Sequence, residues 1–180
     1  MTARAVALTG PPGSGKTAAG RLAAATLKAD YLSAGQQFRD EAARRSMSLE
    51  QFSQYAAEHP EVDRALDARM VASAAPGRLL EGRLVGPMLR RARVPVLWIG
   101  LTARPEVRAA RLAQRDGLPL AEARRAMEVR ESGERDRYRR AYGIDLGQTR
   151  PDLTIDTSEI PAEEVARRIV QAVQRDRGDG

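Results

Sequence analysis

The sequence predicts an α/β fold, with a central parallel sheet and flanking helices. Three observations lead to this prediction. Five short apolar segments alternate with longer segments of helical periodicity along the 180 residues. A glycine-rich stretch separates the first apolar segment from an alanine-rich helical one. No internal repeat or low-complexity linker divides the chain, so we expect residues 1–180 to form a single domain.

The expected strands are short and apolar, as the buried strands of a parallel sheet are. They lie at residues 4–9, 30–33, 78–81, 94–101 and 152–156. Parallel strands need crossover connections, and in α/β folds helices supply them.

The expected helices fill the segments between these strands, at residues 17–27, 34–46, 48–58, 60–74, 105–116, 120–142 and 161–175. Ser48 is expected as an N-cap, with Gln51 completing a capping box. Pro60 is expected to start a helix, and His59 before it to cap the preceding one. The polar residues 175–180 are expected to fray.

Two segments are longer than a crossover needs. Residues 34–75 hold two or three helices between the second and third strands, and residues 116–147 are dense in charge with a glycine near each end. Inserts of this kind on a phosphate-binding core indicate a part that binds a second substrate and a mobile lid. The alternative is that both are ordinary solvated helices.

The loop after the first strand is the most informative motif. It reads Gly10-Pro11-Pro12-Gly13-Ser14-Gly15-Lys16-Thr17, which fits the pattern of Gly, four free positions and Gly-Lys-Ser/Thr. Small residues let backbone N–H groups turn toward phosphate oxygens, and a helix that starts here directs its positive end at the same anion. Lys16 can reach the β- and γ-phosphates, and the Thr17 hydroxyl can hold magnesium. The motif therefore predicts binding of a nucleoside triphosphate.

The charge of the chain is positive, with a net charge of +6 and a pI near 10.4. Lysine occurs only at Lys16 and Lys28, which leaves 28 arginines among the 30 basic residues. Aromatic residues make up only 4% of the chain, too few for stacking platforms on single-stranded nucleic acid. We therefore favour an anionic small molecule over nucleic acid as the partner.

Composition also excludes several kinds of site. Cysteine is absent and histidine occurs once, which excludes a Cys or His metal cluster, a Cys nucleophile and a Ser-His-Asp arrangement. No apolar stretch is long enough to span a membrane, and the first residues do not fit a signal peptide. We expect a cytoplasmic protein without a membrane partner, for which a monomer suffices.

Further candidate residues follow the expected third strand, as Glu81-Gly82-Arg83. Ligands bind at the carboxyl ends of strands in open α/β sheets. Glu81 is a candidate to hold magnesium through its waters, Gly82 to let a substrate approach the backbone, and Arg83 to clamp a phosphate. Arg39 and Arg69 are two further clamp candidates, with an ordinary solvated arginine as the alternative for each.

Arg130, Glu134 and Arg137 lie at i, i+4 and i+7, on one face of the long charged helix. They form either a ladder of surface ion pairs or a group that converges on a ligand. In the second case a carboxylate accepts from the exocyclic amine of cytosine, and the arginines serve its carbonyl or the transferring phosphoryl group. Gly133 is expected to weaken this helix by about 1 kcal/mol relative to alanine.

The order of the motifs is more specific than any one of them. The series comprises Gly10–Thr17, Leu32–Gly35 with Phe38-Arg39, Met47–Glu50, Glu58–Asp63, Glu81–Arg83, Arg130–Ser132 with Arg137-Tyr138, Tyr142–Asp145 and Ile155–Ser158. This series resembles the short cytidylate kinases of the type common in archaea, from Val6 to about Val170. The resemblance implies ATP-dependent phosphorylation of CMP, and of dCMP, with Mg²⁺. It also implies the nucleoside monophosphate kinase fold, with a monophosphate-binding part near residues 34–75 and a lid near residues 116–147.

The resemblance also implies roles for individual residues. Ser33 and Gly35 would line the nucleoside pocket, and Arg39 and Arg83 would hold the CMP phosphate with Arg69 nearby. Arg130 and Arg137 would close over the ligands as part of the catalytic set with Lys16 and Arg83. Glu134 would help to read cytosine, and Arg111 and Arg115 are weaker candidates for the ATP side. Some longer cytidylate kinases carry aspartate where this chain has Glu81, which weakens the magnesium assignment. The alternatives are a small-metabolite kinase such as shikimate kinase, and a non-catalytic protein that binds nucleotides or RNA.

Overall fold

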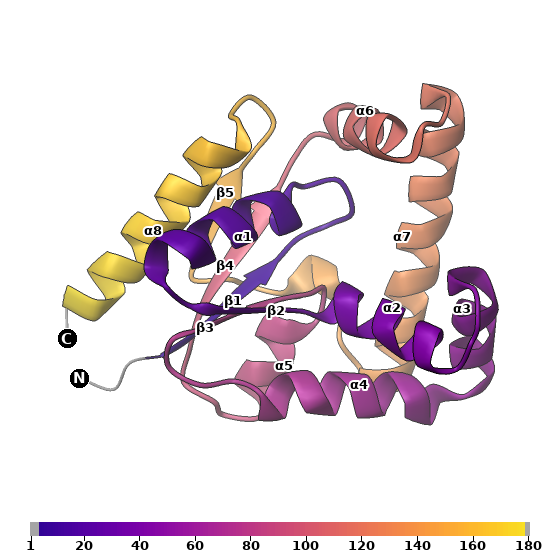
Figure 1. Ribbon diagram of the computed structural model, residues 1–180, viewed down its shortest axis with the longest axis horizontal. Coiled ribbons are helices and arrows are strands. Elements are labelled where there is room, and N and C mark those ends of the chain that lie inside the picture. The colour runs from indigo at the N-terminus through magenta and orange to yellow at the C-terminus, as the bar shows by residue number, and fades with distance from the viewer. Residues whose placement is uncertain (1–3, 179–180) are drawn as a thin grey trace.

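Five parallel strands form the centre of the protein in the computed structural model, which describes residues 4–178. In chain order they are β1 (Ala5–Thr9), β2 (Asp30–Ser33), β3 (Arg78–Glu81), β4 (Val96–Thr102) and β5 (Leu153–Asp156). Their order in the sheet is β2-β3-β1-β4-β5, and every neighbouring pair is parallel. The predicted α/β class with a central parallel sheet is therefore confirmed (Figure 1).

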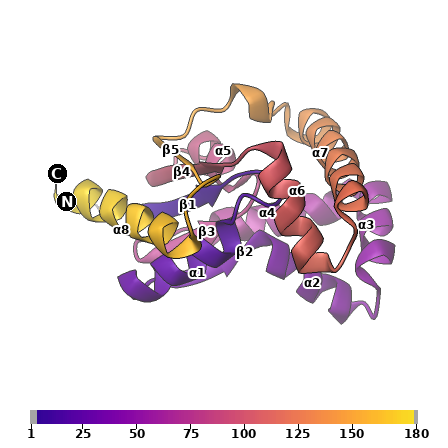
Figure 2. The same ribbon diagram turned by 90° about the horizontal axis from the view of Figure 1, so that it is seen from above.

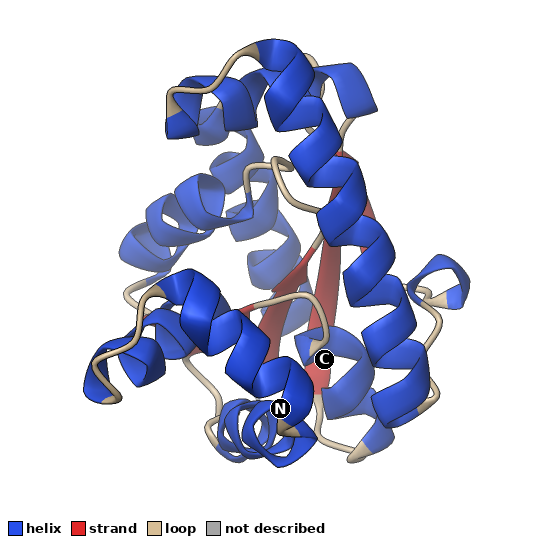
Figure 3. Cartoon of the chain, turned by 90° about the vertical axis from the view of Figure 1, so that its right-hand side faces the viewer, coloured by secondary structure: helices blue, strands red, loops and turns tan. Residues whose placement is uncertain are grey.

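Helices cover both faces of this sheet, as Figures 2 and 3 show. Their bounds are α1 (Lys16–Leu27), α2 (Ala34–Arg44), α3 (Leu49–Glu58), α4 (Pro60–Ala72), α5 (Val85–Arg91), α6 (Pro105–Asp116), α7 (Leu120–Tyr142) and α8 (Ala162–Gly178). A short 3₁₀ turn at Leu146–Gln148 lies between α7 and β5.

The core lies on the two faces of β1, whose five residues are all buried. Val6 and Leu8 pack with apolar residues of α1 and α8, whereas Ala5 and Ala7 pack with residues of α4 and α5. Because successive side chains of a strand point to opposite faces, the continuous apolar run of β1 is what a strand covered on both sides requires.

Two helical groups extend from the edge of the sheet where the strands end, and each has its own small core. The α2–α4 group packs around Phe52, which is fully buried. The α6–α7 pair packs around Leu112 and Met127. The α2–α4 group corresponds to the expected insert at residues 34–75, and of the α6–α7 pair only α7 lies in the expected insert at residues 116–147. The two groups face each other beyond the strand ends (Figure 1).

Most of the predicted elements are confirmed within two residues. The capping box of Ser48 and Gln51 is present, and His59 caps α3 as predicted while also standing at the N-cap of α4. Helix α7 runs without interruption through Gly133, so the expected weakening does not break it.

Two features of the fold differ from what the sequence predicts. Helix α5 is not among the expected helices, which leave residues 84–93 without an element. In the fold Gly86 lies against Trp98, where an added Cβ would be 2.3 Å from the indole Cε2. The fraying predicted from residue 175 does not occur in the described part, because α8 continues to Gly178 and Asp176 accepts a hydrogen bond from Arg4 Nε at 3.1 Å. Residues 179 and 180 lie outside the described residues.

Candidate functional site

The glycine-rich loop lies between β1 and α1, as predicted. Gly13 and Gly15 adopt the left-handed region, with φ values of 76° and 84°. A side chain at Gly13 would also place a Cβ 2.7 Å from the backbone oxygen of Arg108. Glycine is therefore needed at both positions, for its conformation at each and for space at Gly13. Gly15 is the N-cap, and the helix begins at Lys16.

Lys16 of the loop itself and four side chains from distant parts of the chain hold the loop carbonyls. Five successive carbonyl oxygens accept hydrogen bonds: that of Gly10 from Arg83 (3.1 Å), Pro11 from Lys16 (3.0 Å), Pro12 from Arg108 (3.3 Å), Gly13 from Arg111 (3.4 Å) and Ser14 from Thr157 (3.0 Å). With the carbonyls held by these donors, the first N–H groups of α1 remain as the groups that bind phosphate at a helix N-terminus.

Lys16 is half-buried beside the loop, and its Nζ donates to the Pro11 carbonyl at 3.0 Å. Burial is the main cause that lowers the pKa of its ammonium from 10.5 to about 8, and the carboxylate of Glu81 partly offsets it. Arg83, Glu134 and Arg130 also act on this pKa, which shows that they lie near Nζ. A phosphate bound beside the Lys16 ammonium would therefore compensate for the water that the ammonium loses on burial.

Glu81 lies at the end of β3 and is 6% exposed. Its Oε2 accepts hydrogen bonds from the hydroxyls of Thr17 (3.3 Å), Tyr31 (3.0 Å) and Ser33 (2.8 Å). Burial, and then Glu81 itself, raise the pKa of the Tyr31 hydroxyl. Tyr31 could not be singled out from the sequence, because its role comes from the pairing of β2 with β3.

The donor set beside the loop suits magnesium. Thr17 and Glu81 offer a hydroxyl and a carboxylate side by side, and Mg²⁺ binds oxygen through one or two protein groups together with substrate phosphates. Within residues 4–178, no group of three or more His, Asp or Glu side chains could hold a metal ion alone. The residues therefore fit an ion that arrives with a nucleotide.

Glu134 gathers two of the predicted arginines. Arg130 Nε donates to Glu134 Oε1 at 2.9 Å, and Arg83 Nε lies 2.8 Å from Oε2 without the alignment of a hydrogen bond. Glu134 is 8% exposed. Arg130 and Glu134 thus form the predicted pair along α7, and the contact with Arg83 turns this face of the helix toward the loop.

Arg137 lies one turn further along α7 and contacts the α2–α4 group instead. Its Nη1 is 3.3 Å from Asp63 Oδ2 on α4. One turn along α4, Asp67 Oδ2 accepts a hydrogen bond from the Tyr142 hydroxyl at 2.6 Å. Burial raises the pKa of Asp67 to about 6 and also raises that of Asp63. Sequence reasoning missed both aspartates, whose partners are about 75 residues away.

The remaining predicted residues of the α2–α4 group are held locally. Ser33 caps α2 by accepting from Gln36 N at 3.3 Å, and Gly35 follows in the first turn. Arg39 donates to Gln36 Oε1 at 2.9 Å. Arg69 lies 3.6 Å from Glu41 Oε2.

Gly82 has a packing role in this structure. A Cβ at this position would lie 2.8 Å from Val85 Cγ2 and 2.9 Å from Ala34 Cβ. The glycine therefore allows the starts of α2 and α5 to meet behind the strand end. The sequence analysis expected Gly82 to let a substrate approach the backbone and did not predict this packing.

The two arginines assigned to the ATP side differ. Arg111 donates to the Thr157 carbonyl at 2.6 Å and to its hydroxyl at 3.0 Å, next to the loop. Arg115 pairs with its neighbour Asp116 at 2.7 Å. A third arginine of α6, Arg108, bonds the loop directly although the sequence did not single it out. The structure therefore brings Arg111 and Arg108 to the loop and leaves Arg115 in a local pair.

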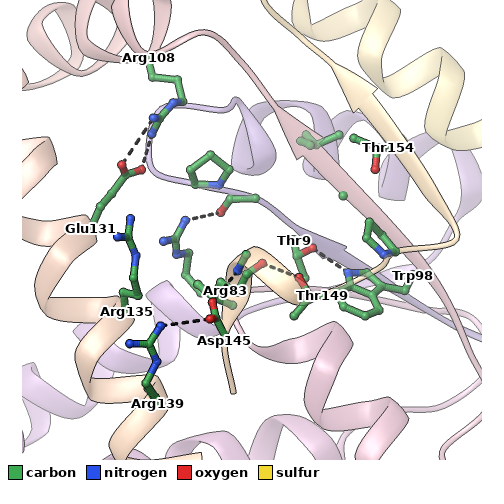
Figure 4. Close-up of a pocket in the computed structure, with 17 residues that line it drawn as sticks. Thr9, Arg83, Trp98, Arg108, Glu131, Arg135, Arg139, Asp145, Thr149 and Thr154 are labelled. Atoms are coloured by element: carbon green, nitrogen blue, oxygen red, sulfur yellow. Dashed lines mark hydrogen bonds and ion pairs between the residues drawn. The ribbon is translucent and has the colours of Figure 1, made fainter. Parts of the chain in front are cut away.

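A cavity of about 610 Å³ adjoins the loop (Figure 4). Gly10 and Pro11 are among its lining residues. Trp98 lies on the side opposite Arg135 and Arg139 of α7 (Figure 4). Residues 13–17 do not line it. The cavity therefore lies beside the phosphate-binding loop and is distinct from the cradle formed by its N–H groups.

Comparison with known proteins agrees with this geometry. A family model described as "AAA domain" matches residues 6–132. A cytidylate kinase of Archaeoglobus fulgidus is 40% identical over 172 residues, covering 94% of each chain. Cytidylate kinases of Pyrobaculum arsenaticum (39% identical, covering 90% of this chain and 88% of theirs) and Methanococcus maripaludis (38%, 91% and 94%) are similar over the same extent.

Solved structures share the fold at low identity. Shikimate kinase from Acinetobacter baumannii superposes with a TM-score of 0.67 at 17% identity, covering 98% of this chain and 96% of that one. This likeness supports the fold alone. None of the described helices has both the length and the apolar character that crossing a membrane requires. The motif order, the loop geometry and relatives that match nearly end to end lead to one conclusion: this chain belongs to the cytidylate kinase family.

Proposed function

We propose that this protein transfers the γ-phosphoryl group of ATP to CMP, and also to dCMP, forming the corresponding diphosphate and ADP. The observation that carries the proposal is the cluster of Lys16, Arg83 and Arg130 around the loop, on a chain whose relatives are cytidylate kinases. One chain supplies every residue of this proposed site, so a monomer suffices. A small anionic substrate also accounts for the positive charge without a nucleic-acid partner.

The proposed reaction needs positioning and charge neutralisation. A phosphate oxygen of CMP attacks the γ-phosphorus in line, and the bond to the β-γ bridging oxygen breaks, which leaves ADP. The acceptor is already an anion near neutral pH, so no strong general base is required. Lys16, Arg83, Arg130 and Arg137 stabilise the negative charge on the transferring group. Thr17 and, through water, Glu81 hold Mg²⁺, which when bound neutralises phosphate charge.

The two helical groups supply the rest of the proposed site. Residues 34–75 bind the monophosphate, with Ser33 and Gly35 at the nucleoside and Arg39 and Arg69 moving toward the phosphate when it is bound. Residues 116–147 act as the lid, whose closure excludes water and limits hydrolysis of ATP. Arg111 lies on the ATP side, and Arg115 must leave Asp116 to join it.

Two carboxylates compete for the role of reading cytosine. Glu134 remains the residue that the sequence suggests, but both of its oxygens face arginines beside Lys16. Asp63 stands next to Arg137 and thus offers an acceptor beside a donor. Cytosine presents the complementary donor and acceptor, whereas uracil presents them reversed and would leave polar groups unpaired. We favour Asp63 as the reader and Glu134 as the residue that holds the arginines.

A coupled ADP-release assay with ATP and Mg²⁺ tests the proposed function. The acceptors are CMP, dCMP, UMP, AMP, GMP and shikimate, compared for the wild type and Lys16→Ala. Turnover with CMP and dCMP, lost in Lys16→Ala, supports the proposal. Lys28→Ala is the matched control, because Lys28 is the only other lysine and lies at the far end of α1. Activity retained in Lys16→Ala, or turnover only with shikimate, contradicts it.

Substitution of the two candidate readers separates their roles. Asp63→Asn should reduce the ratio of CMP to UMP turnover by about 10² or more, since a reversed hydrogen-bond pattern is strongly rejected. Glu134→Gln should lower turnover with both acceptors and leave their ratio within about twofold, because it acts on the phosphate end. The opposite pattern would assign the base to Glu134, as the sequence suggests.

A further inference from the structure

Arg108 differs from the other side chains that bond the loop carbonyls. It is 7% exposed and joins three separate segments. Its Nε donates to the Ala103 carbonyl after β4 at 3.1 Å, and its Nη1 donates to the Pro12 carbonyl in the loop at 3.3 Å. Both guanidinium Nη atoms also face the carboxylate of Glu131 on α7, as Figure 4 shows, and Nη2 lies 3.5 Å from Oε2.

Glu131 lies on α7 between two residues of the candidate site. It directly follows Arg130 and precedes Glu134 by three residues. Because an α-helix is stiff over one turn, holding Glu131 fixes the height and rotation of Arg130 and Glu134 above the loop. The Arg108 backbone also lies against Gly13, as the close approach of a Cβ there shows. A single guanidinium thus sets the distance between the phosphate-binding loop and the lid helix.

Stability alone does not explain this pair. The α6–α7 contact already has an apolar core of Ala109, Leu112, Ala123 and Met127. A buried ion pair contributes little to stability compared with apolar packing, and its best-attested use is to fix one arrangement among several. The pair lies at the loop end of the α6–α7 contact, where it decides how far the lid helix stands from the bound phosphates.

We propose that Arg108 and Glu131 are positioning residues that fix the lid helix relative to the phosphate-binding loop, so that Arg130 meets the transferring phosphoryl group and water is excluded. This inference rests on the proposed kinase function. It predicts that loss of the pair damages transfer and its coupling to ATP consumption more than it damages substrate binding, since misplacement by about 1 Å can cost about 10² in rate.

The test compares Glu131→Gln with the wild type by measuring kcat, the KM values of ATP and CMP, and ADP released per CDP formed. Glu131→Gln keeps the size of the side chain and removes its charge. We expect kcat to fall at least tenfold, both KM values to change less than threefold, and the ratio of ADP to CDP to rise clearly above one. Glu128→Gln is the matched control, because it breaks the exposed Arg124–Glu128 pair on the same helix.

The ratio of ADP to CDP is independent of how much protein is folded, so it separates positioning from stability. If kcat falls only in proportion to the folded fraction while the ratio stays at one, the pair is structural and the proposal is overturned. Wild-type kinetics in Glu131→Gln also overturn it. Glu131→Asp, which keeps the charge but shortens the reach, should show the same changes to a smaller extent if Glu131→Gln cannot be purified. Absence of CDP formation by the wild type would instead refute the proposed function.

Discussion

Lys16 should make the ATP affinity of this protein depend on pH. Burial removes water from its ammonium and lowers its pKa to about 8, and Glu81 only partly offsets this effect. The triphosphate favours the charged form of Lys16, because a nearby anion stabilises an ammonium. Binding of ATP above pH 8 must therefore be accompanied by uptake of a proton at Lys16.

The size of the effect follows from the pKa. With a pKa of about 8, roughly nine-tenths of Lys16 is neutral at pH 9 and roughly one-tenth at pH 7. If the protonated form binds ATP, the dissociation constant is about tenfold larger at pH 9 than at pH 7, which corresponds to about 1.4 kcal/mol. A lysine at its ordinary pKa of 10.5 would give almost no change over this range.

Isothermal titration calorimetry measures both quantities. Titration of ATP at pH 7, 8 and 9, in two buffers of different ionisation enthalpy, gives the affinity and the number of protons taken up. We expect uptake of nearly one proton at pH 9 and about a tenth of a proton at pH 7. Lys16→Met is the control, with weak binding that does not vary with pH. Affinities within about twofold at pH 7 and pH 9, without proton uptake, would show that Lys16 is charged in the free protein and would refute the burial argument.

Three further predictions concern stability. Asp67→Asn keeps an acceptor for Tyr142 and removes a carboxylate whose pKa is raised to about 6. A carboxyl whose pKa is raised in the native state stabilises that state at low pH, and this stabilisation is lost as pH rises through about 6. The difference in melting temperature between variant and wild type should therefore be more favourable to the variant at pH 8 than at pH 5, by roughly 2–4 °C. Equal differences at both pH values would contradict this prediction. Phe52→Ala should lower the free energy of unfolding by about 3–5 kcal/mol in urea titrations, and a loss below about 1 kcal/mol would mean that the α2–α4 core is loosely packed. Gly86→Ala should cost about 1–3 kcal/mol and shift the emission of Trp98, the only tryptophan; an unchanged spectrum would show that the contact is absent.

The sequence was sufficient for the fold where the pattern is local. Apolar runs covered on both faces, such as β1, differ from helical periodicity within a few residues, so strands and helices could be placed. Helix α5 was not predicted, and its Gly86 is explained by contact with Trp98, twelve residues later. A contact between residues that are distant in the sequence leaves no pattern in the residues around either of them.

The residues of the candidate site also differ in whether a local pattern in the sequence reveals them. The loop from Gly10 to Thr17 could be predicted, because one segment carries the whole signal. Helical spacing also placed Arg130 and Glu134 together, and the structure confirms that contact. Tyr31, Asp63 and Arg108 could not be singled out, since each acquires its role from a partner on another element. In a chain with so many arginines, one buried arginine has no distinguishing mark in the sequence.

The charges around the loop explain how a site rich in arginines remains stable in the free protein and still accepts phosphate. Lys16, Arg83 and Arg108 lie among Glu81, Glu134 and Glu131, so these carboxylates offset part of the positive charge, to which Arg111 and Arg130 also contribute. Arg83 Nε is buried beside Glu134 without an aligned hydrogen bond, so it retains a donor for a better placed anion. A phosphate bound between Arg83 and Lys16 could accept a well-aligned hydrogen bond from Arg83 Nε. It would then replace Glu134 in part as the anion beside Arg83. Glu134→Gln would remove this competing anion, so the phosphate of CMP should bind the variant at least as tightly as the wild type even while turnover falls. A weaker affinity for CMP would show that Glu134 serves the bound substrate and does not stand in for it.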